Sequence, residues 1–193
     1  MNMKVLKKTF YQREPAVVAR ELLGKHLVRI LNSRVLSGRI VETEAYYGRN
    51  DPASKAYRGR KTFNELMFMD VGKAFIYMVH GNWLLNIVAH LKNSVGAVLI
   101  RAIEPLEGID VMMKNRNVKD LRSLTNGPGK LTKALSITKE LNGIDITRGN
   151  GKLFVVEGEK QVFEICSSHR IGVREDLPQE LRFFIKGNMY VSK

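Results

Sequence analysis

Hydrophobic and polar positions alternate along several short stretches of this chain, and a period of two predicts β-strands. KHLVRIL (25–31) and VLSGRIVETEAYY (35–47) are separated only by NSR, which predicts a hairpin. A second hairpin is predicted over residues 73–90, with HGN at its tip. SVGAVLIRAIEP (94–105) is almost continuously apolar and predicts a strand buried on both faces. Three later stretches also predict strands: KLFVVEGE, QVFEICSS and LRFFIKG.

Other stretches predict helices and a loop. REPAVVARELLGK (13–25) predicts a short helix, because Pro15 suits a first turn and Gly24 a helix end. Helices are also predicted at PLEGIDVMMKNRN and VKDLRSL, and a Gly-Pro turn precedes one in TNGPGKLTKALSI. Residues 48–66, rich in Gly, Arg, Asn and Asp, predict a loop. With no repeat or linker, we expect one mixed domain with many antiparallel strand contacts.

The composition adds a strong positive charge to this picture. Of 193 residues, 44% are hydrophobic, enough for a substantial core, and 32 Lys and Arg face 19 Asp and Glu, a net charge of +13. Such a chain attracts polyanions: nucleic acid first, an anionic membrane surface second, with a merely solvated basic surface as the alternative. No apolar run approaches the ~18 residues of a membrane-spanning helix, and the basic N-terminal stretch lacks the apolar core of a signal peptide. We therefore expect an intracellular protein.

Cysteine and histidine usage bounds the chemistry. Cys166 is the single cysteine, so no intrachain disulfide can form, and its place in a strand predicts a core thiol. The four histidines show no ligand spacing, so no metal site is expected.

The most informative stretch is SGRIVETEAYYGRNDPASKAYRGRK (37–61). In a strand, Glu42, Glu44 and Tyr46 share one face, and the strand runs into a strongly basic loop. A carboxylate at a cleft can activate water or stabilise positive charge. The alternative is an exposed edge strand with two solvated acids. Arg101, embedded in an apolar strand, needs a partner, which is either a structural carboxylate or a substrate or phosphate group.

Two further stretches carry candidate contacts to nucleic acid. Tyr77, His80 and Trp83 lie on or beside the second hairpin tip, where flat side chains can stack on bases or wedge between them. The alternatives are core packing for Tyr77 and Trp83 and a solvated turn for His80. NGPGKL (126–131) offers either a phosphate seat at a helix N-terminus or a plain helix-entry turn.

Six stretches, in order, resemble the alkyladenine type of 3-methyladenine DNA glycosylase: LLGKHLVR, GRIVETEAYYG, NDPAS, LIRAIEPLEG, NGPGKLTKAL and LRFFIKGNMYVS. The resemblance implies an α+β fold, with one domain over residues 1–193, a curved antiparallel sheet, flanking helices and a protruding β-hairpin. It also implies a monofunctional base-excision repair enzyme that uses water and no metal or other cofactor. Its implied substrate is double-stranded DNA containing alkylated purines, or in some members hypoxanthine or ethenoadenine, and its product is an abasic site. We expect a monomer that acts inside the cell, with the DNA.

The resemblance also implies roles for individual residues. Glu44 is the implied base that activates water, with Arg101 near the water and the DNA backbone. The implied pocket for the flipped base consists of Tyr46, Tyr77, Asn86 and Lys55. His80 takes the intercalating position, and the implied DNA-binding residues are Arg58, Arg60 and Lys130.

Three departures from the family pattern cluster where the base is gripped and the duplex opened. Lys55 replaces a histidine, His80 replaces a tyrosine, and HGNWLLN is one residue short, so the match at Asn86 depends on a gap. They motivate an alternative, a DNA-binding module of the same fold with lost or narrowed activity. Charge alone leaves a third hypothesis, a basic RNA-associated protein.

Overall fold

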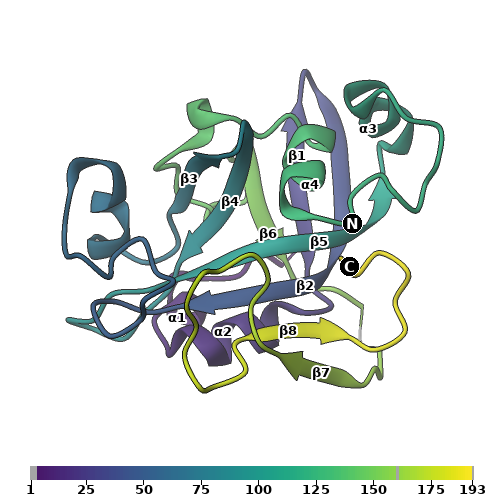
Figure 1. The fold of residues 1–193 in the computed structure, drawn as a ribbon. Helices are drawn as coiled ribbons and strands as arrows, with labels where there is room; N and C mark the ends of the chain where they lie inside the picture. The colour runs from purple at the N-terminus through teal and green to yellow at the C-terminus, as the bar shows by residue number, and fades with distance from the viewer. Residues whose placement is uncertain (1–3, 160, 193) are drawn as a thin grey trace.

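One curled, antiparallel sheet organises the part of the chain that the structure describes (Figure 1). The computed structural model describes residues 4–159 and 161–192. Within these residues the strand order is β3-β4-β5-β2-β1-β6, while β8 pairs with both β2 and β7. The strands are β1 His26–Leu31, β2 Arg34–Tyr46, β3 Ala74–Val79, β4 Asn82–Val88, β5 Ala97–Glu107, β6 Leu153–Val156, β7 Ile165–Ser168 and β8 Arg182–Ile185.

Strand β2 is the centre of this sheet. One of its edges pairs with β5, and the other pairs with β1 along its first half and with β8 over residues 42–44. Both predicted hairpins are confirmed. The two-residue turns Asn32–Ser33 and His80–Gly81 have positive φ at every position (48°, 63°, 46° and 76°), which is the type I′ geometry that suits twisted strands.

Short helices and 3-10 turns flank the sheet. They are α1 Lys8–Tyr11, α2 Pro15–Leu22, η1 Thr62–Phe68, α3 Ile109–Arg116, α4 Pro128–Ala134 and η2 Lys139–Leu141. The predicted helices that begin at Pro15 and Pro128 are confirmed. The predicted helix over 118–124 is wrong, because the Asp120 carboxylate accepts hydrogen bonds from the backbone N–H groups of Arg122 and Ser123 and forms a turn instead. The predicted loop at 48–66 also contains the start of η1.

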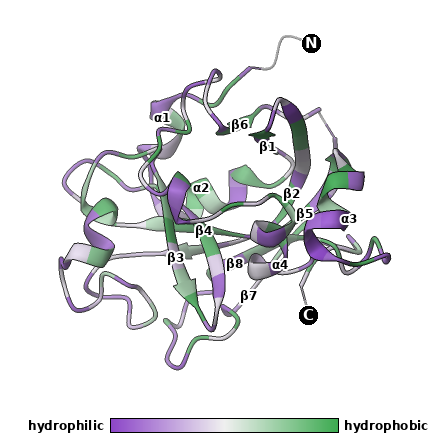
Figure 2. Ribbon diagram, turned by 90° about the horizontal axis from the view of Figure 1, so that it is seen from above, coloured by the Kyte–Doolittle hydropathy of each residue, from purple (hydrophilic) through white to green (hydrophobic). Residues whose placement is uncertain are grey.

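The main core lies between the sheet and helices α2 and α4. Val18 and Leu22 from α2 pack there with Ile100 from β5 and Leu131 from α4. The prediction that the 94–105 strand is buried on both faces is confirmed over residues 97–103. Cys166, predicted to be a core thiol, is only half-buried, because β7 is an outer strand that pairs with β8 alone. Figure 2 shows the contrast between hydrophobic β3 and hydrophilic α3.

Candidate active site

The strand register places a row of side chains across one face of the sheet. Phe75 on β3 pairs with Asn86 on β4, Asn86 with Leu99 on β5, Leu99 with Glu44 on β2, and Glu44 with Arg182 on β8. Directly paired residues share a face. Asn86 and Glu44 therefore face the same side, with one strand between them, and this placement follows from the register rather than from any alignment.

Two bulges aim Arg101 at the carboxylates of β2. The β2–β5 register shifts on either side of Glu42, and Arg101 is left without a pairing partner between Ile100 and Ala102. A bulge redirects a side chain. The Arg101 guanidinium donates from Nε to Glu42 Oε1 at 3.0 Å and from Nη1 to Glu44 Oε2 at 3.2 Å. Arg101 therefore has structural partners, and it also borders the large cleft described below.

Glu44 is fully buried but surrounded by donors. Its Oε2 accepts from the Tyr46 hydroxyl at 2.8 Å, and its Oε1 accepts from the backbone N–H of Ile171 at 2.8 Å. Burial raises the pKa of Glu44 above its ordinary value, although Arg101, the Ile171 N–H and Tyr46 oppose that shift. Glu44 is thus a carboxylate with increased affinity for a proton. The alternative of solvated acids on an edge strand is wrong, since Glu42 and Glu44 are both 0% exposed.

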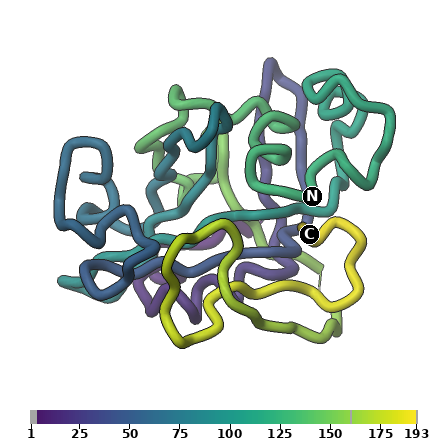
Figure 3. Tube along the Cα trace, in the orientation of Figure 1, coloured from purple at the N-terminus to yellow at the C-terminus, as the bar shows by residue number. Residues whose placement is uncertain are grey.

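The segment after β7 supplies much of this environment. Residues 169–181 cross in front of β2 (Figures 1 and 3), and the N–H of Ile171 comes from this segment. Arg170 lies there too, with a fully buried side chain that donates to Asp51 at 2.7 Å and to Asp176 at 2.6 Å. Its guanidinium carbon lies 4.6 Å from the centre of the Tyr46 ring, so this ion network fixes one face of that ring.

Tyr77 stands on the same sheet face as Asn86. Burial raises the pKa of Tyr77 to about 12, so its phenol is neutral at physiological pH. The Phe75 ring lies 5.0 Å from the Tyr77 ring, and the Lys55 ammonium lies 5.2 Å from its centre. Lys55 is held in place by Asn64, which is buried and donates from Nδ2 to the Lys55 carbonyl at 2.7 Å.

A cleft of about 1030 Å³ collects most of the predicted residues. Its lining contains five cationic side chains and one carboxylate, Glu175, so the cleft favours a polyanion. Glu44 and Asn86 lie behind this lining, and Arg60 is outside it, paired with Glu65. The predicted residues that line the cleft are Tyr46, Lys55, Arg58, Tyr77, His80, Arg101 and Lys130.

His80 and Trp83, the two candidates for wedging between bases near the hairpin tip, differ in their surroundings. His80 is exposed, lies in the turn and borders the cleft. Trp83 pairs with Met78, so it lies on the hairpin face opposite to that of Tyr77, and it packs against the main core. Its carbonyl accepts a hydrogen bond from Thr132 at 2.7 Å. The packing interpretation is therefore confirmed for Trp83, while the wedge role of His80 stays a prediction.

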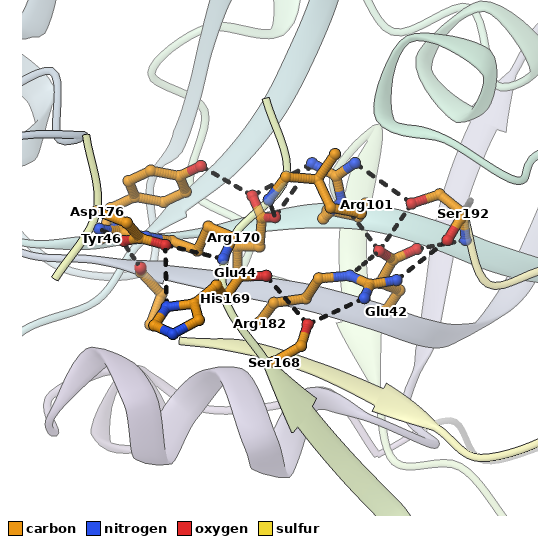
Figure 4. A network of polar contacts seen from close by, with 12 residues as sticks. Glu42, Glu44, Tyr46, Arg101, Ser168, His169, Arg170, Asp176, Arg182 and Ser192 are labelled. Atoms are coloured by element: carbon orange, nitrogen blue, oxygen red, sulfur yellow. Dashed lines mark hydrogen bonds and ion pairs between the residues drawn. The ribbon is translucent and has the colours of Figure 1, made fainter. Parts of the chain in front are cut away.

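Sequence reasoning missed the residues that surround Glu42. Arg182 donates to Glu42 at 2.7 Å, and Ser192 donates to it from both its backbone N–H and its hydroxyl (Figure 4). Arg182 in LRFFIKG, like Arg101, is a charge inside an apolar strand, and the same signal could have identified it. Nothing local in the sequence marks Ser192, because its partner is 150 residues away.

Two features are absent from the described residues: a cluster of metal ligands and a membrane-spanning helix. Residues 4–159 and 161–192 contain no group of three or more His, Cys, Asp or Glu side chains arranged to hold a metal ion. Over the same ranges, no helix has the length and apolar character needed to cross a membrane.

A buried carboxylate with a raised pKa, behind a cationic cleft, is the arrangement expected of a hydrolase that acts on nucleic acid. The family model for methylpurine-DNA glycosylase (MPG) matches residues 9–189. Relatives from Carboxydothermus hydrogenoformans, Aeropyrum pernix and Clostridium novyi are 45%, 42% and 43% identical to the chain, covering 98%, 98% and 99% of it and 99%, 94% and 100% of their own lengths. Each carries the name "Putative 3-methyladenine DNA glycosylase". This chain belongs to the methylpurine-DNA glycosylase family, and is by class a DNA glycosylase of DNA repair.

Proposed function

We propose that this chain excises damaged, alkylated purines from double-stranded DNA by hydrolysis, with Glu44 as the base that activates water. The flipped purine enters the cleft, the C1′–N9 bond breaks, and its electrons leave with the base. The water oxygen bonds to C1′ and its proton passes to Glu44, so an abasic site remains. The enzyme uses no metal, cofactor or lysine nucleophile in this reaction, and it acts as a monomer, inside the cell, on the DNA.

The observation that carries this proposal is the environment of Glu44. Tyr46, Arg101 and Ile171 border the cleft and all contact its carboxylate. A carboxylate in that position stabilises the positive charge that develops on the sugar as the base leaves. Because Glu44 itself is fully buried, water from the cleft reaches it only when a bordering side chain moves. Tyr46, hydrogen-bonded to Glu44, stands at that boundary.

The remaining predicted residues fit roles around this centre. Tyr46 and Tyr77 are proposed to stack on the flipped base, with Asn86 and Lys55 contacting its edge. His80 is proposed to enter the space that the base vacates, since it is exposed at a hairpin tip bordering the cleft. Arg58 and Lys130, which also line the cleft, are proposed to contact phosphates, together with the outlying Arg60.

The decisive variant is Glu44→Gln, which keeps the shape of the side chain and removes the base. We expect single-turnover excision to fall by roughly 10²–10⁴-fold while duplex binding is retained. In the parent protein the rate should decline as the pH falls through the raised pKa of Glu44, because only the carboxylate accepts a proton.

The matched control is Glu164→Gln, which removes an exposed carboxylate paired with Lys186 at 2.9 Å. It should excise at the parental rate. Near-parental excision by Glu44→Gln would transfer the role of base to another group, with Glu42 the first to examine. A parent protein that binds duplex DNA but releases no base from any of a panel of alkylated and deaminated purines would instead support the binding-module alternative.

A further inference from the structure

Arg101 is shared between two buried carboxylates, and only Glu44 also contacts the cleft-lining residues Tyr46 and Ile171. Its Nε donates to Glu42 and its Nη1 to Glu44, and the Arg101 side chain is 8% exposed. A guanidinium that served Glu44 alone would form a complete ion pair with it. Here only Nη1 of Arg101 donates to Glu44, the proposed base, while Nε donates to Glu42 and Nη2 to Ser192.

The surroundings of Glu42 are built to hold a carboxylate in a fixed place. Oε1 accepts from Arg101 at 3.0 Å, from Arg182 at 2.7 Å and from the Ser192 hydroxyl at 2.8 Å. Oε2 accepts from the Ser192 N–H at 2.7 Å. Four donated hydrogen bonds reach this carboxylate, and Arg182 also donates to the Ser192 carbonyl at 3.1 Å. Arg182 and Ser192, both distant from Glu42 in sequence, therefore fix the position of its carboxylate (Figure 4).

From this geometry we infer that Glu42 is a positioning residue for the glycosylase reaction. Clamped by Arg182 and Ser192, it holds one half of the Arg101 guanidinium so that the other half lies against Glu44. Glu44 then shares the arginine instead of forming a full ion pair, and it remains able to accept a proton from water. The inference rests on the proposed function of Glu44 and assigns to Glu42 no contact with DNA.

Several charged or titratable groups face Glu44 and define what the test measures. They are Glu42 and Tyr46 on β2, Arg101 on β5, Tyr77 on β3 and Arg182 opposite on β8. Among them Glu42 is the like charge, which raises the pKa of Glu44, while Arg101 lowers it. Removing the charge of Glu42 should therefore lower the pKa of Glu44 and strengthen its pairing with Arg101.

The test is Glu42→Gln, measured by the pH profile of single-turnover release of 7-methylguanine from a defined duplex. This cationic base leaves without being protonated, so the acid limb reports on Glu44. We expect the limb to move to lower pH by roughly 0.5–2 units and the plateau rate to fall about 10-fold, with unchanged duplex affinity. A limb at the parental pH, or a rate loss that only follows the loss of folded protein, would overturn the inference.

A second variant keeps the test decisive if Glu42→Gln does not fold, because removing one partner from a buried ion network can strongly destabilise a protein. Ser192→Ala keeps both carboxylates and the backbone N–H but removes the hydroxyl that contacts Glu42 and Arg101. We expect its plateau rate to fall several-fold at parental duplex affinity, and a parental rate would overturn the inference. Glu164→Gln is again the control. If neither it nor the parent releases the base, the proposed function fails instead.

Discussion

Replacing Lys55 with glutamine tests whether a charge beside Tyr77 sorts damaged bases by their own charge. Lys55 lines the cleft, and its ammonium lies 5.2 Å from the centre of the Tyr77 ring. Within the described residues, no carboxylate lies within ion-pair distance of it. A purine stacked on Tyr77 would therefore have an uncompensated positive charge nearby. Purines alkylated on a ring nitrogen, such as 7-methylguanine, are cationic, while hypoxanthine is neutral.

The size of the effect follows from Coulomb's law. Two unit charges about 6 Å apart repel by ~0.7 kcal/mol in water and by ~2.8 kcal/mol at an effective dielectric constant near 20. Lys55 is exposed, so solvent screens it and the lower part of this range applies. We take about 1 kcal/mol, which corresponds to roughly a 5-fold difference in rate or affinity.

The assay compares kcat/KM for 7-methylguanine and for hypoxanthine placed at the same position of one duplex. Lys55→Gln should raise the ratio of the cationic to the neutral lesion by about 5-fold. Any loss of phosphate contact lowers both values equally and cancels in the ratio. Lys61→Gln, in the same loop but outside the lining of the large cleft, should leave the ratio unchanged. The reasoning is refuted if Lys55→Gln changes both lesions by the same factor.

Two further predictions concern the duplex itself. His80→Ala should slow excision of a well-paired lesion more than excision of the same lesion opposite a mismatch, because opening the mismatched pair costs less free energy. His80→Tyr should retain or improve activity. If His80→Ala and the parent excise both substrates at equal rates, His80 is a solvated turn residue. Duplex affinity should fall with salt, and Arg58→Gln should reduce the log–log slope by about 0.9; a slope that is the same in parent and variant would remove Arg58 from the phosphate contacts.

Local patterns predicted the two hairpins, β1–β2 and β3–β4, because each pair of strands is joined by a two-residue turn. Alternation and two-residue turns are properties of neighbouring residues, so both hairpins followed from the sequence. The false helix at 118–124 arose because VKDLRSL has a helix-like composition, while the Asp120 carboxylate bonds the backbone in a turn. Composition alone does not show whether such a stretch forms a helix or a turn held by a side chain.

The site was predictable only where it is local to one strand. Glu44 and Tyr46 are two residues apart and share a face, which a period of two predicts. The bulge at Arg101 and the buried Arg170–Asp51 pair were not predictable, because each depends on how segments distant in sequence come together. Charged residues within apolar strands were the usable signal, and that signal applied to Arg182 as well as to Arg101.

The residues that complete the surroundings of Glu42 and Glu44 are synthesised long after β2, because several of them come from the C-terminal part of the chain. Glu44 is made early, but its backbone donor Ile171 follows 127 residues later, and Arg182 and Ser192, which donate to Glu42, follow that residue by 140 and 150 residues. A nascent chain that has left the ribosome only as far as β6 already contains Glu44, Tyr46 and Arg101 but lacks these three later donors. The complete hydrogen-bond network around the two carboxylates can therefore form only after residues 171–192 have been synthesised.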